Sequence, residues 1–228
     1  MRIHVTRHAQ PGPYVPKPGD DPQIPPGDKG ITELGERQSL WLGERLVELG
    51  FKGTIHSSPY HRTMQTAQIA AEIIGTRIRP EPAIQEYVPN PGLPDGVGQT
   101  LEQIHGRYAN IAHDAALQHP WFVTGPEDQE AVQRRVKPFI DQLVDRQAED
   151  VLLVGHGATI WACFEVIKGL GEIVGELPEL NNGWNCSLST YDVDAQLRTQ
   201  ILQLFDVSHM PPECVSSNGE YLVPRDHS

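Results

Sequence analysis

Short apolar strands alternate with amphipathic helices along most of the chain. Residues 151–154 form an unbroken apolar run, which is typical of a strand buried in a parallel sheet. Further strands are predicted at residues 3–5, 53–56 and 76–79, and a closing antiparallel hairpin at residues 187–191 and 199–205. Helices are predicted at residues 33–49, 60–74, 100–117, 127–147 and 159–168. Such alternation indicates an α/β fold.

Local signals mark several helix boundaries. Thr32 is a suitable N-cap for the first helix, and Gly50 suits a left-handed residue at its end. Thr100 and Gln103 have the spacing of a capping box. Pro138 lies inside the fourth helix and removes a backbone hydrogen bond there, so we expect a kink or a split at this position.

The order of these elements predicts a single three-layer domain over residues 1–228, with a mostly parallel central sheet and helices on both faces. Twenty prolines modify this picture, since seven fall at residues 11–26 and five at residues 80–94. Helix interiors and central strands exclude proline. We therefore expect a proline-rich loop insertion at about 11–28, a second surface loop at 80–94, and an irregular tail after about 207.

Net charge and cysteine content indicate which kinds of partner and which cellular location to expect. Eighteen basic and 30 acidic residues give a net charge of −12, which argues against nucleic acid because its binding depends on clustered Lys and Arg. The uncharged run 151–164 is too short to span a bilayer, so no membrane partner is expected. Three cysteines without a CxxC pair favour a reducing compartment. With no signal peptide visible, we expect a cytoplasmic protein.

Two histidines directly follow two of the predicted strands. The first strand continues into Arg7 and His8, and the buried apolar strand is followed within two residues by His156. Ligands of open α/β sheets bind beyond the carboxyl ends of the strands, so the two imidazoles meet if these strands are neighbours. Arg62 lies in the first turn of the second helix, on the same edge. Two arginines, two histidines and open helix N-termini predict a site for a tetrahedral phosphate.

These groups have the chemistry that phosphoryl transfer needs. A neutral imidazole attacks phosphorus when its other nitrogen donates to a carbonyl. The guanidinium groups of the arginines and a protonated second histidine would stabilise the negative charge on the equatorial oxygens of the phosphoryl group. The leaving alkoxide needs an acid, for which Glu86 is the leading candidate and Glu81 and Asp95 are rivals nearby in sequence. No set of Cys, Asp and His has convincing zinc spacing, so we expect neither a metal nor another cofactor.

Five motifs follow one another in a recognisable order. They are Arg7-His8-Ala9 after a strand, residues 31–38 (ITELGERQ), residues 57–67 (SSPYHRTMQTA), Glu86, and Gly155-His156-Gly157. Together they resemble the histidine phosphatase superfamily, also called phosphoglycerate mutase-like. The resemblance covers residues 3 to about 160, and residues 185–190 resemble the strand that usually follows.

The resemblance implies a role for each matched residue. His8 would be the phosphorylated nucleophile, and Arg7, Arg62 and His156 would form the phosphate pocket. Glu86 would be the proton donor. The implied activity is hydrolysis of a phosphomonoester, either a small molecule or a phosphoprotein, through a phosphohistidine and without a metal.

Three features depart from the family pattern. Ala9 stands in place of the usual glycine and would be strained if it needed a positive φ. The family often has an Asn that helps hold phosphate where this chain has its proline-rich loop, and Gln10 is the candidate substitute. The Trp, Asn and Gly-Trp pattern of the glycolytic mutases is absent between His8 and Thr32, which favours a phosphatase.

Two alternative functions stay open: a phosphoglycerate-type mutase, and an inactive phosphate-binding regulatory module. The strands within residues 187–205 would supply an edge for a possible homodimer. The proline-rich residues 11–26 begin three positions after His8, and residues 80–94 bracket Glu86. We therefore expect both stretches to form stiff walls of the active-site mouth, on the same side as His8.

Overall fold

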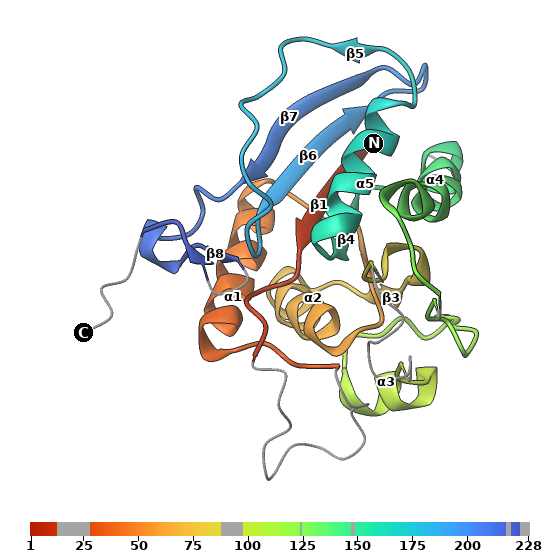
Figure 1. Ribbon diagram of the computed structural model, residues 1–228, viewed down its shortest axis with the longest axis vertical. Helices are drawn as coiled ribbons and strands as arrows, with labels where there is room; N and C mark the ends of the chain where they lie inside the picture. Colours follow the sequence, from red (N-terminus) through yellow and green to blue (C-terminus); the bar gives the residue numbers. More distant parts are fainter. Residues whose placement is uncertain (13–27, 88–97, 124, 147–148, 218–219, 224–228) are drawn as a thin grey trace.

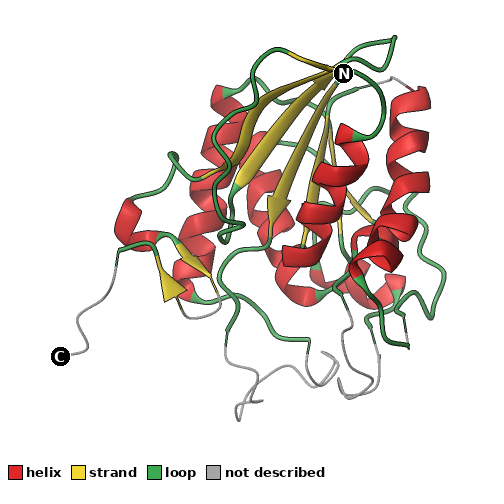
Figure 2. Ribbon diagram, turned by 45° about the horizontal axis from the view of Figure 1, so that its top comes forward, coloured by secondary structure: helices red, strands yellow, loops and turns green. Residues whose placement is uncertain are grey.

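The computed structural model describes residues 1–12, 28–87, 98–123, 125–146, 149–217 and 220–223. These residues form an α/β fold in which a seven-stranded sheet lies between two layers of helices (Figures 1 and 2). The strands of this sheet are β1 (Arg2–Arg7), β2 (Thr54–Ser57), β3 (Ile78–Pro80), β4 (Val151–Gly155), β5 (Ile173–Val174), β6 (Leu188–Val193) and β7 (Thr199–Asp206). The α-helices are α1 (Glu33–Glu48), α2 (His61–Ile74), α3 (Leu101–Arg107), α4 (Gln129–Arg146) and α5 (Gly157–Lys168).

The sheet has the strand order β3-β2-β4-β1-β6-β7-β5. β3, β2, β4 and β1 pair in parallel, whereas β6 runs antiparallel to both β1 and β7. The sheet is therefore mostly parallel and carries the closing hairpin β6–β7, as predicted. β5 pairs with β7, and its two residues were too short a run for the sequence pattern to reveal.

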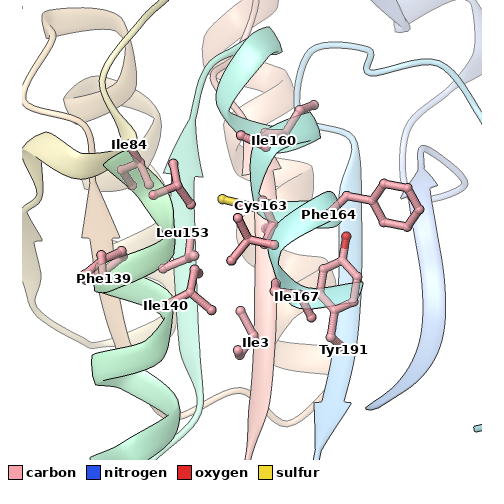
Figure 3. Close-up of a cluster of buried hydrophobic side chains, with 14 of the residues drawn as sticks. Ile3, Ile84, Phe139, Ile140, Leu153, Ile160, Cys163, Phe164, Ile167 and Tyr191 are labelled. Atoms are coloured by element: carbon pink, nitrogen blue, oxygen red, sulfur yellow. The ribbon is translucent and has the colours of Figure 1, made fainter. Parts of the chain in front are cut away.

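Two apolar cores, one on each face of the sheet, account for the alternating pattern of the strands. Ile3 and Leu153 face α4 and α5 in the cluster that Figure 3 shows. Leu152 and Val154 point to the opposite face, where they join the apolar side chains of α1 and α2. Successive strand residues thus bury themselves in different layers, which is why the run 151–154 is apolar throughout.

α3 is shorter than predicted. It begins at the predicted capping box of Thr100 and Gln103 but ends at Arg107 rather than near residue 117. After the helix, the Asn110 carbonyl accepts from the N–H of Ile78, and the Ala112 N–H donates to the Ile78 carbonyl. The chain therefore pairs with the edge strand β3 in place of further helical turns, a tertiary contact that helix signals do not reveal.

α4 runs unbroken through Pro138, so the helix is not split there. Pro138 is exposed, and water can bond the carbonyl that loses its helical partner on this face. Neither α4 nor any other helix in the described part of the chain is long and apolar enough to cross a membrane.

The described residues after 207, which are 208–217 and 220–223, contain short regular elements where we predicted an irregular tail. They form a 3-10 turn at Pro212–Cys214 and the strands β8 (Ser216–Ser217) and β9 (Glu220–Tyr221), which pair antiparallel. The Asn185 N–H donates to the Ser216 carbonyl over 2.9 Å. Strands of two residues carry no periodicity, so long-range contacts rather than local pattern determine this segment.

The proline-rich insertion begins and ends at a common base. Pro11 forms a β-bridge with Ile31, and the Gly12 N–H donates to the Gly30 carbonyl over 2.7 Å. Residues 13–27 of this insertion, and residues 88–97 of the second loop, lie outside the described residues. The prediction that both loops wall the active-site mouth therefore stays a prediction.

Candidate active site

The carboxyl ends of β1 and β4 bring the two predicted histidines together. Arg7 is paired with Gly155 in the parallel register, and the His8 N–H donates to the Gly155 carbonyl over 2.9 Å. The rings of His8 and His156 lie with their centroids 5.2 Å apart. The two strands are neighbours, which is the condition the sequence analysis set for a shared site.

His8 is buried, and one of its ring nitrogens is already engaged. Nδ1 lies 2.8 Å from the Ala9 carbonyl oxygen, and because a carbonyl only accepts, Nδ1 carries the hydrogen and Nε2 keeps its lone pair. Burial, together with the charge of Arg62, lowers the pKa of His8 well below its usual value. His8 is therefore a neutral imidazole at neutral pH, with the Nε2 lone pair available for attack.

Ala9 fits without strain. Among the described non-glycine residues, a positive φ occurs at Cys186, Leu197 and Phe205 and not at Ala9. The Ala9 methyl group is buried in the core on the α1–α2 face, and the Ala9 N–H donates to Thr66 Oγ1 over 3.0 Å. The alanine therefore replaces the usual glycine in an ordinary backbone conformation.

Arg62 connects the remaining predicted residues. It lies in the first turn of α2 and is 7% exposed. Its Nη2 donates to His156 Nδ1 over 3.0 Å and to Glu86 Oε2 over 3.1 Å. The other nitrogen of His156, Nε2, lies 2.8 Å from Ser58 Oγ. Since Nδ1 accepts from Arg62, Nε2 carries the hydrogen and donates to Ser58.

Glu86 is the candidate acid that the fold brings to the pocket. Its Oε2 lies 3.3 Å from His156 Nδ1, and its side chain is 29% exposed, so solvent and a leaving group can reach it. Glu81 instead caps the 3-10 turn Pro82–Ile84. Asp95 lies outside the described residues. Of the two carboxylates that can be compared, geometry favours Glu86 as the proton donor.

The protonation states of His156 and Glu86 depend on whether an anion is bound between them. Burial lowers the pKa of His156 to about 4 although Glu86 acts to raise it, so without a bound anion the ring is neutral at neutral pH. Burial acts to raise the pKa of Glu86, but the contact with His156 and the charge of Arg62 outweigh it and hold the pKa well below the usual value. A phosphate dianion between these groups would raise the pKa of both.

Arg7 is buried beside His8 and held at one end of its guanidinium. Nη1 donates to the Gly183 carbonyl over 2.8 Å and to Ser217 Oγ over 2.7 Å. Burial lowers the pKa of Arg7, but an arginine so far above neutrality stays charged. Arg7 and Arg62 thus place two guanidinium groups around His8, as the resemblance implied.

Gln10, the predicted substitute for a phosphate-binding Asn, has its side-chain amide occupied. Nε2 donates to Ser216 Oγ and to Tyr221 OH, each over 3.1 Å. Oε1 accepts from Thr32 Oγ1 over 2.7 Å. A contact between Gln10 and phosphate would require some of these bonds to break, so the fold does not bring Gln10 together with the pocket as it does Arg62 and Glu86.

Three residues of the site were not among the predicted ones: Ser58, Asn185 and Ser217. Ser58 belongs to a motif that the sequence displays, and a polar residue just before α2 was a usable signal. Asn185 donates through Nδ2 to the His8 carbonyl over 3.0 Å, a contact that depends on β6 pairing with β1. Ser217 is 210 positions from Arg7, and no local pattern reveals such a contact.

One group in the described part of the chain has the donor atoms of a metal site: His8, Glu86 and His156 offer ligand atoms within 4.8 Å of one another. However, Arg62 donates to His156 Nδ1 and to Glu86 Oε2, so it competes for two of those three lone pairs. A second cation next to two guanidinium groups is also electrostatically unfavourable. The chemistry of this donor set therefore suits an oxyanion better than a metal ion.

The fold and the pocket define a class of α/β protein in which two arginines and two histidines gather at the carboxyl edge of the sheet. The model of the histidine phosphatase superfamily (branch 1) matches residues 3–205. The chain belongs to this superfamily, which confirms the resemblance seen in its motifs.

Relatives in this superfamily carry both phosphatase and mutase names. The putative phosphoserine phosphatase 2 of Hydrogenobacter thermophilus is 24% identical over 184 residues, which cover 81% of this chain and 83% of the relative. The probable phosphoglycerate mutase GpmB of Yersinia pestis is 28% identical over 173 residues, covering 72% of this chain and 74% of the relative. The family thus leaves a phosphatase and a mutase as the two activities to compare.

Solved structures share the fold over nearly the whole chain. The ecdysone phosphate phosphatase of Bombix mori, in complex with tungstate, superposes with a TM-score of 0.68 at 17% identity and covers 96% of this chain and 97% of its own. A mycobacterial glucosyl-3-phosphoglycerate phosphatase in complex with VO3 has a TM-score of 0.59 at 22% identity, with coverages of 90% and 99%. These similarities confirm the predicted phosphoglycerate mutase-like fold.

Proposed function

We propose that this protein is a phosphatase that hydrolyses a phosphomonoester through a phosphohistidine on His8, without a metal. The observation that supports the proposal most strongly is the hydrogen bond from His8 Nδ1 to the Ala9 carbonyl. It fixes the tautomer in which Nε2 is the nucleophile. Arg7 and Arg62 supply the positive charge that the equatorial oxygens need. The substrate would be a small phosphate ester or a phosphoprotein.

In the first step, Nε2 of His8 forms a bond to phosphorus while the bond between phosphorus and the ester oxygen breaks. Arg7 and Arg62 bind the remaining oxygens. The bound dianion also raises the pKa of His156, so that Nδ1 becomes protonated and donates to the phosphoryl group in place of accepting from Arg62. Because the bound dianion raises the pKa of Glu86, its carboxyl group is protonated and gives its proton to the leaving alkoxide. The products are the free alcohol and a phosphoryl group on His8.

In the second step, water attacks the phosphorus of the phosphohistidine. Glu86, now a carboxylate, takes a proton from this water. The bond between phosphorus and Nε2 breaks, its electron pair returns to Nε2, and inorganic phosphate leaves. His8 is then again the neutral imidazole that began the cycle.

Trapping of the intermediate tests the proposal directly. Rapid quenching without acid, with a phosphate ester labelled on phosphorus, should place the label on His8. His8→Ala should lose the label and at least about 10,000-fold in kcat. His105→Ala, which removes an exposed histidine of α3, is the matched control and should label as the wild type does. Full turnover by His8→Ala would contradict the proposal.

The mutase names among the relatives support one alternative, in which His8 returns the phosphoryl group to another hydroxyl of the product. Measuring free phosphate against isomerised phosphoglycerate separates the two activities. A regulatory module that binds phosphate without turnover would show phosphate-dependent thermal stabilisation and no labelled His8. Release of phosphate at the same rate as consumption of ester supports the phosphatase over both alternatives.

A further inference from the structure

The C-terminal segment, residues 207–223, folds back onto the first motif of the chain. It lies beyond residues 3–205, which match the family, and its strand β8 lies beside α1 in Figure 1. Gln38 of α1 anchors the segment, because its Nε2 donates to the Cys214 carbonyl over 2.8 Å and to Ser216 Oγ over 3.1 Å. A part of the chain outside the family match is thus hydrogen-bonded to α1, close to the first motif.

Within this segment, Ser217 contacts the guanidinium of Arg7. Nη1 of Arg7 has two hydrogens, which it donates to Ser217 Oγ over 2.7 Å and to the Gly183 carbonyl over 2.8 Å. A guanidinium is planar, so two acceptors on one nitrogen fix the orientation of the whole fork. The Nε atom of Arg7 lies toward α5. It would be 3.9 Å from a Cβ atom added at Gly157, the first residue of that helix.

Ser216, next to Ser217, connects β8 to the nucleophile. Its Oγ accepts from Gln10 Nε2 and from Gln38 Nε2, each over 3.1 Å, and donates to Asn185 Oδ1 over 3.2 Å. Asn185 in turn donates to the His8 carbonyl. These polar groups are buried or half-buried, and a satisfied network of this kind favours one geometry.

We propose that β8 is a positioning element of the phosphate pocket, in which the Ser217 hydroxyl orients Arg7 toward the phosphoryl oxygens. The proposal rests on the proposed function, because it takes Arg7 as a ligand of the phosphoryl group. Ser217 acts through Arg7 and is a positioning residue, not a catalytic one. Without its hydroxyl, the buried guanidinium loses one of the acceptors on Nη1 that help set its plane, and its alignment with an oxyanion weakens.

Substitutions at Ser217 and calorimetry with inorganic phosphate test the proposal. Ser217→Ala should weaken phosphate binding about tenfold and lower kcat/KM for p-nitrophenyl phosphate by a similar factor, while the variant still folds and melts cooperatively. Ser217→Thr keeps a hydroxyl on the strand and should restore both quantities. Ser208→Ala is the matched control and should equal the wild type, because Ser208 is exposed in the same segment and bonds to Asp206 over 2.8 Å.

Unchanged or tighter phosphate binding by a folded Ser217→Ala would overturn the proposal, as would a threonine variant that binds no better than the alanine variant. If Ser217→Ala does not fold, Ser217→Cys replaces the hydroxyl by a weaker acceptor of similar shape, and wild-type phosphate binding by that variant would overturn the proposal. Calorimetry needs no turnover. A wild type that hydrolyses no ester would therefore contradict the proposed function while the test of β8 still stands.

Discussion

The two sides of the pocket are held in place in different ways. The nucleophile side consists of Arg7, His8 and the residues that bind them, Asn185 and Ser217. Its contacts run to backbone carbonyls and to a hydroxyl, at 2.7 to 3.0 Å. Because these acceptors are uncharged, their geometry does not depend on pH or on the charge of a bound ligand.

The acid side consists of Arg62, Glu86 and His156, which contact one another at 3.0 to 3.3 Å. Here the protonation states of Glu86 and His156 depend on the charges around them, so an arriving dianion changes both. Under the proposed mechanism, the nucleophile is therefore ready before substrate binds, whereas the acid gains its proton when substrate binds.

Among the residues that hold the two sides in place, as distinct from the nucleophile itself, the largest effect should come from removing the centre of the acid side. Arg62→Ala deletes one phosphate ligand and the partner of both Glu86 and His156, so kcat/KM should fall about 1,000-fold. Arg62→Lys keeps the charge without the fork and should recover only part of this loss. Steady-state kinetics measures both variants, with Arg134→Ala on the exposed face of α4 as control. A loss smaller than that of Ser217→Ala would contradict the ranking of the two sides.

Glu86→Gln should have an intermediate effect that depends on the leaving group. Hydrolysis of an alkyl phosphate should fall about 100-fold, because the alkoxide needs a proton. Labelling of His8 by p-nitrophenyl phosphate should change little, since nitrophenolate leaves without one. Comparing the two esters measures the acid role apart from folding. Glu81→Gln is the matched variant, and a larger dependence on the leaving group there would make Glu81 the acid.

The smallest effect concerns stability and involves Asp28, which caps the helix that carries Arg62. Asp28 Oδ1 accepts from the His61 N–H over 2.7 Å, and the side chain is buried. Burial raises the pKa of Asp28 from 3.8 to about 7. A raised pKa means that the native state binds this proton more tightly, so the stabilisation is complete below pH 3.8 and is lost as pH rises through 7.

Asp28→Asn keeps the cap but cannot ionise, and should therefore remove this pH dependence. The variant and the wild type should differ little near pH 4, and at pH 8 the variant should be more stable by on the order of 3 kcal/mol. Urea denaturation at several pH values measures the difference, with the exposed Asp141→Asn as control. A stability difference that is constant with pH would contradict the raised pKa of Asp28.

The sequence was sufficient to predict the parts of the site that follow from local pattern and topology. His8 and His156 each follow an apolar strand, and neighbouring parallel strands end at the same edge, so their meeting required only the strand order. The early end of α3 and the contact of Ser217 with Arg7 were beyond prediction. Both depend on segments far apart in the chain that pair through a few hydrogen bonds, which composition and periodicity do not encode.

The two ends of the proline-rich insertion are bonded to each other, which bears on how substrate specificity can change. The bonds between Gly12 and Gly30 and between Pro11 and Ile31 close the insertion on itself. The entropy cost of a closed loop grows only slowly with its length. If the insertion walls the active-site mouth as predicted, changes in the length or sequence of residues 13–27 should alter substrate recognition and leave His8 in place.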